Sequence, residues 1–253
     1  MQLHFVEFCL FLIFVVIMIK GCFYLQIKYT QLLVRVGGKP LLFIPASFSV
    51  PVHELSHALM AVICFHKVNK VVLFQMNREG TLGYVEHSYS PSVLRIFTNM
   101  FIGIAPLIGG ALVCTWLFTH FYDYSLSVAF QSAQDSAKNG LDINYFEIVI
   151  SMIRQNSDDA KFWLVSFIAV NVWVFSLPSP ADFQGAGKGI VLTLGMLLAF
   201  AYFDSSGSLI EFSMTYVSSV FISIIFLSII ILSPIIVALM IIAQLKGRVL
   251  APK

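Results

Sequence analysis

Three ionisable residues lie close together in the segment PVHELSHALM, residues 51–60. In a helix His53 and His57 share one face, because they are four residues apart, so both imidazoles can bind one metal ion. Glu54 lies beside them and can reach a water on that ion. Zinc lowers the pKa of such a water towards about 7, so Glu54 could take its proton and later deliver it to a leaving amine. The spacing therefore predicts a hydrolytic zinc site with Glu54 as its base.

The segment around this cluster is apolar, and ionisable groups are costly to bury at membrane depth. The chain of 253 residues is 58% hydrophobic and 11% charged, whereas soluble domains carry about 25% charged residues. This composition predicts an all-α polytopic membrane protein, with the lipid bilayer as a partner. It contains no basic run that would indicate a nucleic acid as partner. In the alternative interpretation, both histidines only pack against other helices and Glu54 pairs with a basic group, at a high cost of burial.

Apolar runs long enough to cross a bilayer, about 20 residues of helix, recur along the chain. We expect about six transmembrane helices in a single membrane domain, residues 1–253. Their ranges are 6–25, 41–65, 96–118, from 162 onward, 190–203 and 217–245. Pro51 is expected to kink or restart the second of them one turn before His53. Ala105 and Gly109 form the small-xxx-small pattern of closely packed membrane helices.

Two segments are too polar to cross the membrane. Residues 68–90 contain two β-rich runs on either side of the sequence NREG, which predicts a small β-hairpin directly after the HELSH helix. Residues 122–160 are rich in aspartate and form an acidic extramembrane loop, in which YFEIVISMI could be an amphipathic helix. Residues 122–160 are expected to be the only sizeable soluble piece of the chain.

A catalytic zinc site needs a third protein ligand. The favoured candidate is Asp182, in SLPSPADFQG at the edge of the fourth span, where Pro178 and Pro180 interrupt the helix. Unwound backbone at membrane depth is tolerated where it is buried or lines a cavity. A capping Asp at a membrane interface is the alternative interpretation. The other candidates are His87, Glu79 and Glu86 in the hairpin, whereas His66, about 13 Å from His57 by helical rise, is too far away to join the site.

These two motifs together resemble the site-2 protease family of intramembrane zinc metalloproteases. HELSHAL matches the first family motif, which implies that His53 and His57 are zinc ligands and Glu54 is the base. FSLPSPADFQG is similar to the second motif, approximately N-x-x-P-x-P-x-L-D-G, and implies Asp182 as third ligand. One residue fewer separates the prolines from the Asp, and the glycine is delayed to Gly185. The resemblance covers a catalytic core of about residues 41–190.

The asparagine of the second motif has no counterpart at the expected position. Asn171 lies eleven residues before Asp182, about 16 Å away if the segment is helical. Ser176 or Ser179 could replace it as a hydrogen-bond donor to the substrate. The departure concerns the stabilisation of substrate and leaves the predicted metal ligands unchanged.

The sequence therefore predicts an intramembrane zinc endopeptidase, a multi-pass protein of the cell membrane. It would hydrolyse a peptide bond in or near a transmembrane segment of a membrane-protein or peptide substrate. The hairpin segment GTLGYV could bind an extended substrate by strand addition, or the hairpin could simply link two helices. The alternatives are a non-proteolytic membrane scaffold or binding module with a structural or absent metal, and a zinc hydrolase that acts on lipids or small amides.

Overall fold

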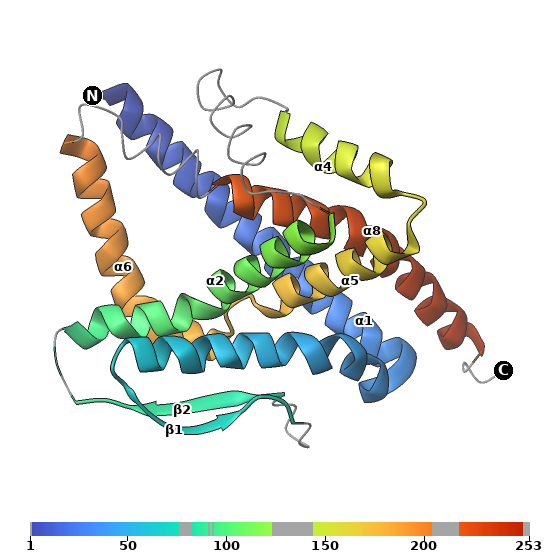
Figure 1. Cartoon of the computed structure of the whole chain (residues 1–253), viewed down its shortest axis with the longest axis horizontal. Coiled ribbons are helices and arrows are strands. Elements are labelled where there is room, and N and C mark those ends of the chain that lie inside the picture. The colour runs from blue at the N-terminus through green and yellow to red at the C-terminus, as the bar shows by residue number, and fades with distance from the viewer. Residues whose placement is uncertain are drawn as a thin grey trace.

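The computed structural model describes residues 2–75, 82–90, 92, 94–122, 144–203 and 218–249. The described part of the chain is mostly helical, with one two-stranded antiparallel sheet (Figure 1). The elements in chain order are α1 (Gln2–Ile63), β1 (Lys67–Val72), β2 (Tyr84–Ser88), α2 (Leu94–Tyr122), α4 (Asn144–Asn156), α5 (Ala160–Phe175), α6 (Pro180–Phe203) and α8 (Ser218–Val249). The helix predicted in the acidic loop is confirmed as α4, whereas residues 123–143 of that loop lie outside the described residues.

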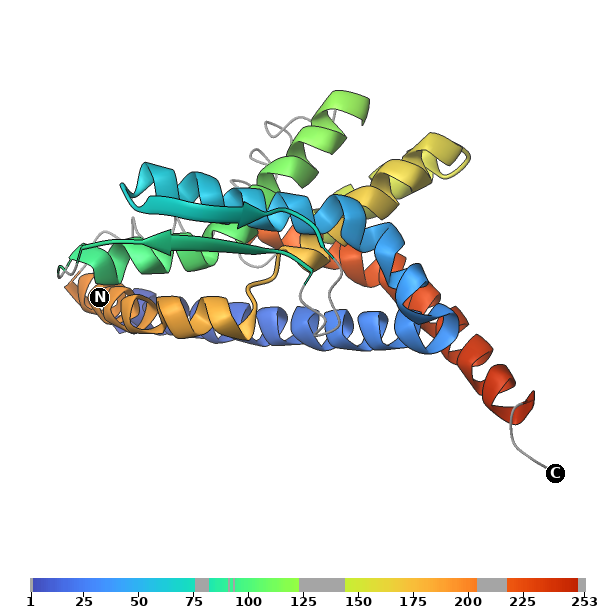
Figure 2. The ribbon, with the colours of Figure 1, turned by 90° about the horizontal axis from the view of Figure 1, so that it is seen from below.

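The long helix α1 consists of two helices that meet at Gly38. Gly38 has φ 69° and ψ −169°, a left-handed conformation that glycine adopts without steric cost. The chain reverses there, so that the second half of α1 returns above the first half (Figure 2). The helix does not restart at Pro51, since Gly38 is the one residue within α1 whose φ and ψ leave the helical region.

Four helical segments in the described part of the chain are long and apolar enough to cross a membrane, judged by length and composition. They are Ile19–Ile63, Leu94–Tyr122, Pro180–Phe203 and Ser228–Lys246. The sequence predicted about six. The first two expected spans lie together in α1, and the expected fourth span is the shorter apolar helix α5, which ends at Phe175.

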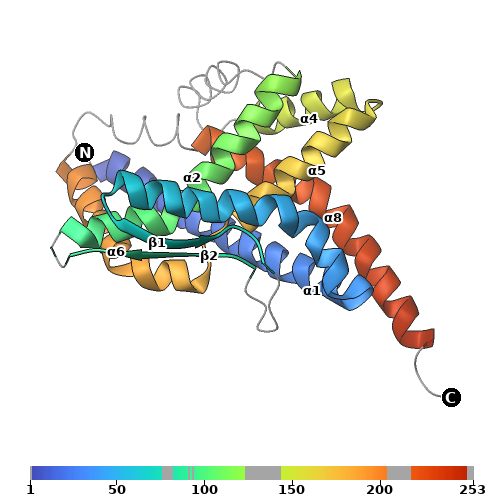
Figure 3. The same cartoon turned by 60° about the horizontal axis from the view of Figure 1, so that its bottom comes forward.

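The predicted hairpin is confirmed, with its turn sequence NREG outside the described residues. β1 and β2 are antiparallel, with Val71 opposite Val85, Val72 opposite Tyr84, and an irregularity in register between Val68 and Lys70. The hairpin lies alongside the second half of α1, the half that carries the HELSH sequence (Figure 3). The order of the chain therefore places a strand pair next to the candidate site.

The last turns of α5 lie in the centre of the helix packing. Every residue from Ala169 to Phe175 is buried, and α5 packs against α1, α2 and α8. Trp173, at 2% exposed, and Leu232 of α8, at 0%, belong to the same apolar core. A helix that is apolar on all sides is stable only when it is surrounded in this way. The end of α5 is therefore fixed beside α1, where it takes part in the site.

Candidate metal centre

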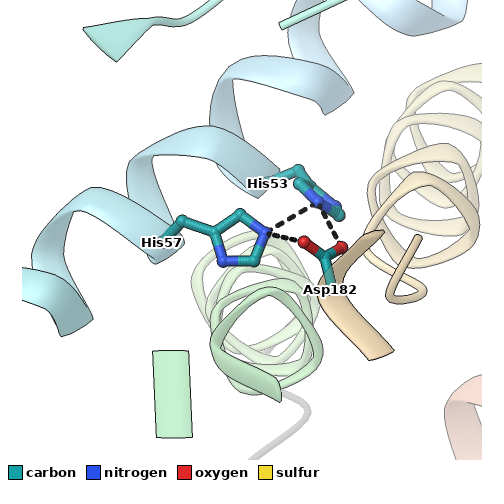
Figure 4. A group of neighbouring side chains, drawn as sticks. All are labelled: His53, His57 and Asp182. Atoms are coloured by element: carbon teal, nitrogen blue, oxygen red, sulfur yellow. Dashed lines mark hydrogen bonds and ion pairs between the residues drawn. The ribbon is translucent and has the colours of Figure 1, made fainter. Parts of the chain in front are cut away.

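Three predicted ligands from two distant segments come together in the folded chain. His53 and His57 of α1 are 8% and 7% exposed, and their Nε2 atoms lie 3.1 Å apart. The Asp182 carboxylate, in the first turn of α6, approaches both rings (Figure 4). Its Oδ1 is 3.1 Å from Nε2 of His57, and its Oδ2 is 3.5 Å from Nε2 of His53. One ligand atom from each residue lies within 4.8 Å of the other two, so the group could hold a metal ion.

Backbone carbonyls fix the orientation of both imidazole rings. Nδ1 of His53 lies 2.8 Å from the carbonyl oxygen of Phe175, and Nδ1 of His57 lies 2.8 Å from that of Ile102. A carbonyl can only accept, so each Nδ1–H donates, and in the neutral ring Nε2 carries a lone pair. This second hydrogen bond is typical of metal-binding histidines, because it fixes both tautomer and ring orientation.

Each of the two accepting carbonyls lacks an N–H partner within its own helix. Phe175 is the last residue of α5, and the last carbonyls of a helix have no partner within it. Ile102 lies inside α2, four residues before Pro106, which is fully buried. Proline has no N–H, so the hydrogen bond that a helix would form to the carbonyl of Ile102 is missing. A helix end and an internal proline therefore supply the two acceptors.

The convergent groups require a cation or a proton. With both Nδ1 atoms donating, the two Nε2 lone pairs and the Asp182 carboxylate point at one small volume without a hydrogen between them. Ligand nitrogens at 2.0–2.1 Å from a tetrahedral zinc are about 3.3 Å apart, close to the 3.1 Å found here. Two imidazoles and a carboxylate are also donors that zinc accepts in catalytic sites. The residues present therefore fit a zinc ion.

Asp182 is held in place by a reciprocal cap at the start of α6. The backbone N–H of Ser179 donates to Oδ2 of Asp182 at 2.6 Å, and the N–H of Asp182 donates to Oγ of Ser179 at 3.2 Å. Pro180 is the first helical residue, where its missing N–H costs nothing. The capping role considered for Asp182 therefore coexists with its place in the cluster. Ser179 serves as the partner in this cap.

Glu54 is buried beside the cluster and beneath the hairpin. It is 7% exposed and lies close enough to His53, His57 and Asp182 to interact electrostatically with all three. Gly83, just before β2, lies directly against it: a Cβ at Gly83 would come within 2.7 Å of Cγ of Glu54. The hairpin backbone therefore forms one wall around this carboxylate.

The other histidines and acidic residues considered as ligands lie elsewhere where the structure describes them. His66 and His87 contact each other, with their Nδ1 atoms 3.0 Å apart, outside the three-residue group. Glu86 is exposed on β2, and Glu79 falls outside the described residues. Asn171 is buried in α5, where its Nδ2 donates to the carbonyl of Phe167 at 2.8 Å. Among the described candidates for the third ligand, Asp182 is the one that joins the two histidines.

Two glycines of α2 let neighbouring helices approach the site. Gly109, from the predicted small-xxx-small pair, faces Ser56 of α1, one residue before His57. A Cβ at Gly103 would lie 2.6 Å from Cβ of Ala186 and 2.9 Å from the carbonyl oxygen of Asp182. The sequence pattern indicated close packing at Gly109. It did not indicate the contact at Gly103, which lets α6 bring Asp182 to the histidines.

The proline in α2 leads to a testable expectation. In a Pro106→Ala variant the new N–H can bond to the carbonyl of Ile102 and compete with His57 for it. Because loss of such a partner typically costs 10- to 100-fold in metal affinity, we expect the zinc Kd to rise by about tenfold or more. Titration calorimetry on detergent-purified protein would measure it. Pro45→Ala is the matched control, since Pro45 is also a fully buried proline inside a helix. Equal zinc affinity in the two variants would contradict this role of Pro106.

No protein family, curated protein or solved structure matches this chain. The candidate centre is therefore defined by its own geometry. It is a His53, His57 and Asp182 group that could hold a metal ion, in a helical protein with four apolar segments of membrane length among its described residues.

Proposed function

We propose that this protein is an intramembrane zinc endopeptidase of the cell membrane. The observation that carries the proposal is the convergence of two histidine Nε2 atoms and one carboxylate, with a second buried carboxylate, Glu54, beside them. The centre lies on segments Ile19–Ile63 and Pro180–Phe203, both long and apolar enough to span a membrane. A peptide bond cleaved there would belong to a membrane-protein or peptide substrate.

His53, His57 and Asp182 would hold the metal. Zinc bound by these three residues would supply a water with a pKa of about 7 and a positive charge that polarises a carbonyl group. Three protein ligands leave a fourth position open, as in catalytic rather than structural zinc sites. The mixed nitrogen and oxygen donors favour zinc over magnesium or calcium, which prefer sites made of oxygen atoms.

Glu54 would move the protons of the reaction. Its carboxylate can accept a proton from the attacking water and deliver it to the leaving amine, provided that both lie within about 2.6–3.2 Å. A structural metal site has no need for a carboxylate next to its first ligand. The position of Glu54, buried and adjacent to the histidines, therefore supports hydrolysis over a purely structural metal.

The hairpin supports a peptide as substrate. A two-stranded sheet leaves an unpaired edge on each strand, to which an extended peptide can add by main-chain hydrogen bonds. The contact between Gly83 and Glu54 places this backbone at the predicted base. A helical transmembrane substrate would have to unwind locally to present its peptide bond there.

A scaffold without metal is the second candidate, and one distance favours it. If His57 were protonated, its Nε2–H would donate to Oδ1 of Asp182 at 3.1 Å and join α1 to α6 without any ion. Such a protein would bind partners through its helices and cleave nothing. Metal analysis distinguishes this hydrogen bond between His57 and Asp182 from a zinc site.

Removal of the metal tests the proposed function. We expect about one zinc per chain in detergent-purified protein, and loss of this zinc in a His57→Ala variant, because the variant lacks one of three ligands. Cleavage of a reporter membrane protein should stop after treatment with a chelator and return when zinc is added. Elemental analysis and gel electrophoresis measure the two effects. Wild-type protein without zinc, or cleavage that survives the chelator, would contradict the proposal.

A further inference from the structure

A second pair of histidines joins the hairpin to the helices. His66, which follows α1, and His87 of β2 face each other with their Nδ1 atoms 3.0 Å apart. His66 is 5% exposed, and its Nε2 lies 2.9 Å from Oγ1 of Thr98 in α2. The ring of Tyr89 packs against His66, with centroids 4.7 Å apart. These residues connect α1, β2 and α2 at one place, outside the candidate metal centre.

The hydrogen bonds around Thr98 settle which atoms carry protons. The hydroxyl of Thr98 donates to the carbonyl of Arg95 at 3.3 Å, so it accepts from Nε2–H of His66. The neutral ring of His66 then has a bare Nδ1, and Nδ1–H of His87 donates to it. In this arrangement two neutral histidines make one good hydrogen bond between the hairpin and the end of α1.

Protonation of both rings removes this bond. A proton added to His66 must go to Nδ1, where it would face the Nδ1–H of His87. One proton can be accommodated if His87 moves its own hydrogen to Nε2, but a second proton leaves two N–H groups and two positive charges opposed. The pKa of His66 is lowered by burial and by the neighbouring His87 and Arg95. The pKa of His87 is lowered by burial and by His57. The closed arrangement therefore binds protons more weakly than free imidazoles do.

The other groups around the pair do not reverse this sign. From α2 the pair is approached by the cation Arg95, whose Nη1 donates to the carbonyl of Cys64 at 3.0 Å. The thiol of Cys64 is neutral, because burial raises its pKa. On β1 the residue opposite His87 is Val68, and the carboxylate of Glu86 belongs to the adjacent pair with Lys70. Charge near the two rings is thus mostly positive.

The same hairpin also covers Glu54. The contact is made by Gly83, which lies four residues before His87. We propose that the hairpin is a lid over Glu54, held closed by the hydrogen bond between His66 and His87 and released by acidification. That this lid regulates a reaction rests on the proposed function. A histidine pKa lowered in the closed state favours closure above the ordinary value of 6.5 and opposes it as the pH falls below that value.

Distance measurements between spin labels test the lid without any need for cleavage. One label is placed at Val71 on β1 and one at Leu164 on α5, both exposed, in a chain whose Cys9 is replaced by serine. We expect one distance at pH 7.5 and a second, longer distance that becomes populated at pH 5.5. The same distances at both pH values would overturn the proposal.

A His66→Gln variant makes the test specific. Glutamine can donate to Thr98 and still present an oxygen to Nδ1–H of His87, whether His87 is neutral or charged, so the hairpin should stay closed at pH 5.5. His120→Gln, which changes a histidine at the other end of α2, should open like wild type. Should His66→Gln fail to fold, His87→Gln is expected to lose the pH response in the same way. If the hairpin of the His66→Gln protein still opens on acidification, the hydrogen bond between His66 and His87 is not what holds it closed, and the proposal is overturned.

These readouts separate the two proposals. If the hairpin opens with acid but the protein cleaves no substrate, the proposed lid stands and only the proposed endopeptidase function is refuted. If the protein cleaves its reporter while the label distances stay fixed between pH 7.5 and 5.5, the endopeptidase function stands and the acid-released lid is refuted.

Discussion

Replacing Glu54 with Gln is expected to lower the rate of peptide-bond cleavage by about a thousandfold and to leave the zinc content unchanged. General acid–base catalysis typically contributes 10²- to 10⁴-fold, and an amide can neither accept the proton of water nor deliver it to the amine. Gln has nearly the shape of Glu, so the packing beneath Gly83 should survive. The measurement is the cleavage rate of a reporter membrane protein together with zinc per chain by elemental analysis.

The matched control for this variant is Glu86→Gln. Glu86 is an exposed carboxylate on β2, opposite Lys70, and lies outside the metal centre. It should cleave at the wild-type rate, which shows that the effect depends on position rather than on charge. Cleavage by Glu54→Gln at the wild-type rate would remove Glu54 from the reaction. Loss of zinc from Glu54→Gln would give it a structural part in the centre instead.

An Asp182→Ala variant is expected to lose zinc and all cleavage. Two histidines alone bind zinc weakly, and we expect the zinc Kd to rise by at least about a hundredfold, more than for loss of a hydrogen-bond partner of a ligand. The variant also loses the carboxylate that accepts from the N–H of Ser179, so the first turn of α6 should be less stable. Zinc titration and thermal unfolding of the purified protein measure these two effects separately.

Ser179→Ala separates the cap from the ligand. It removes the hydroxyl that accepts from the N–H of Asp182 but keeps the carboxylate, so it should cost about 1 kcal/mol in stability, as N-caps typically do, and should still bind zinc. If Asp182→Ala binds zinc as well as Ser179→Ala does, Asp182 is only a cap. The cluster would then need another third ligand.

The parts of the site that follow a local rule could be predicted from the sequence. The spacing of His53 and His57 places them on one helix face whatever surrounds them, and two prolines before Asp182 indicated a helix boundary, found between Phe175 and Pro180. The antiparallel hairpin likewise followed from two β-rich runs. These features depend on interactions within a few residues of the chain.

The parts that depend on distant backbone could not be predicted in the same way. The acceptors of the two histidines are carbonyls 122 and 45 residues away, and a carbonyl leaves no mark in a sequence. The signal that existed was Pro106, whose missing N–H frees the carbonyl of Ile102. A kink or restart was expected at Pro51, whereas the break in α1 lies at Gly38, between the expected spans 6–25 and 41–65, because the left-handed φ of 69° suits glycine. The number of spans differed because the two helices that meet at Gly38 count as one segment, Ile19–Ile63, and because α5 is shorter than a full span.

The two histidine–carbonyl bonds have a thermodynamic consequence. Residues of α1, α2, α5 and α6 meet at the centre, so an ion bound there would be linked to the association of all four helices. A ligand that binds only the folded state adds RT ln(1 + [L]/Kd) to the free energy of unfolding, about 4 kcal/mol at a concentration a thousand times Kd. The melting temperature would then report metal occupancy directly. By the same linkage, a substitution that loosens the packing of α5 should weaken zinc binding even if it touches no ligand.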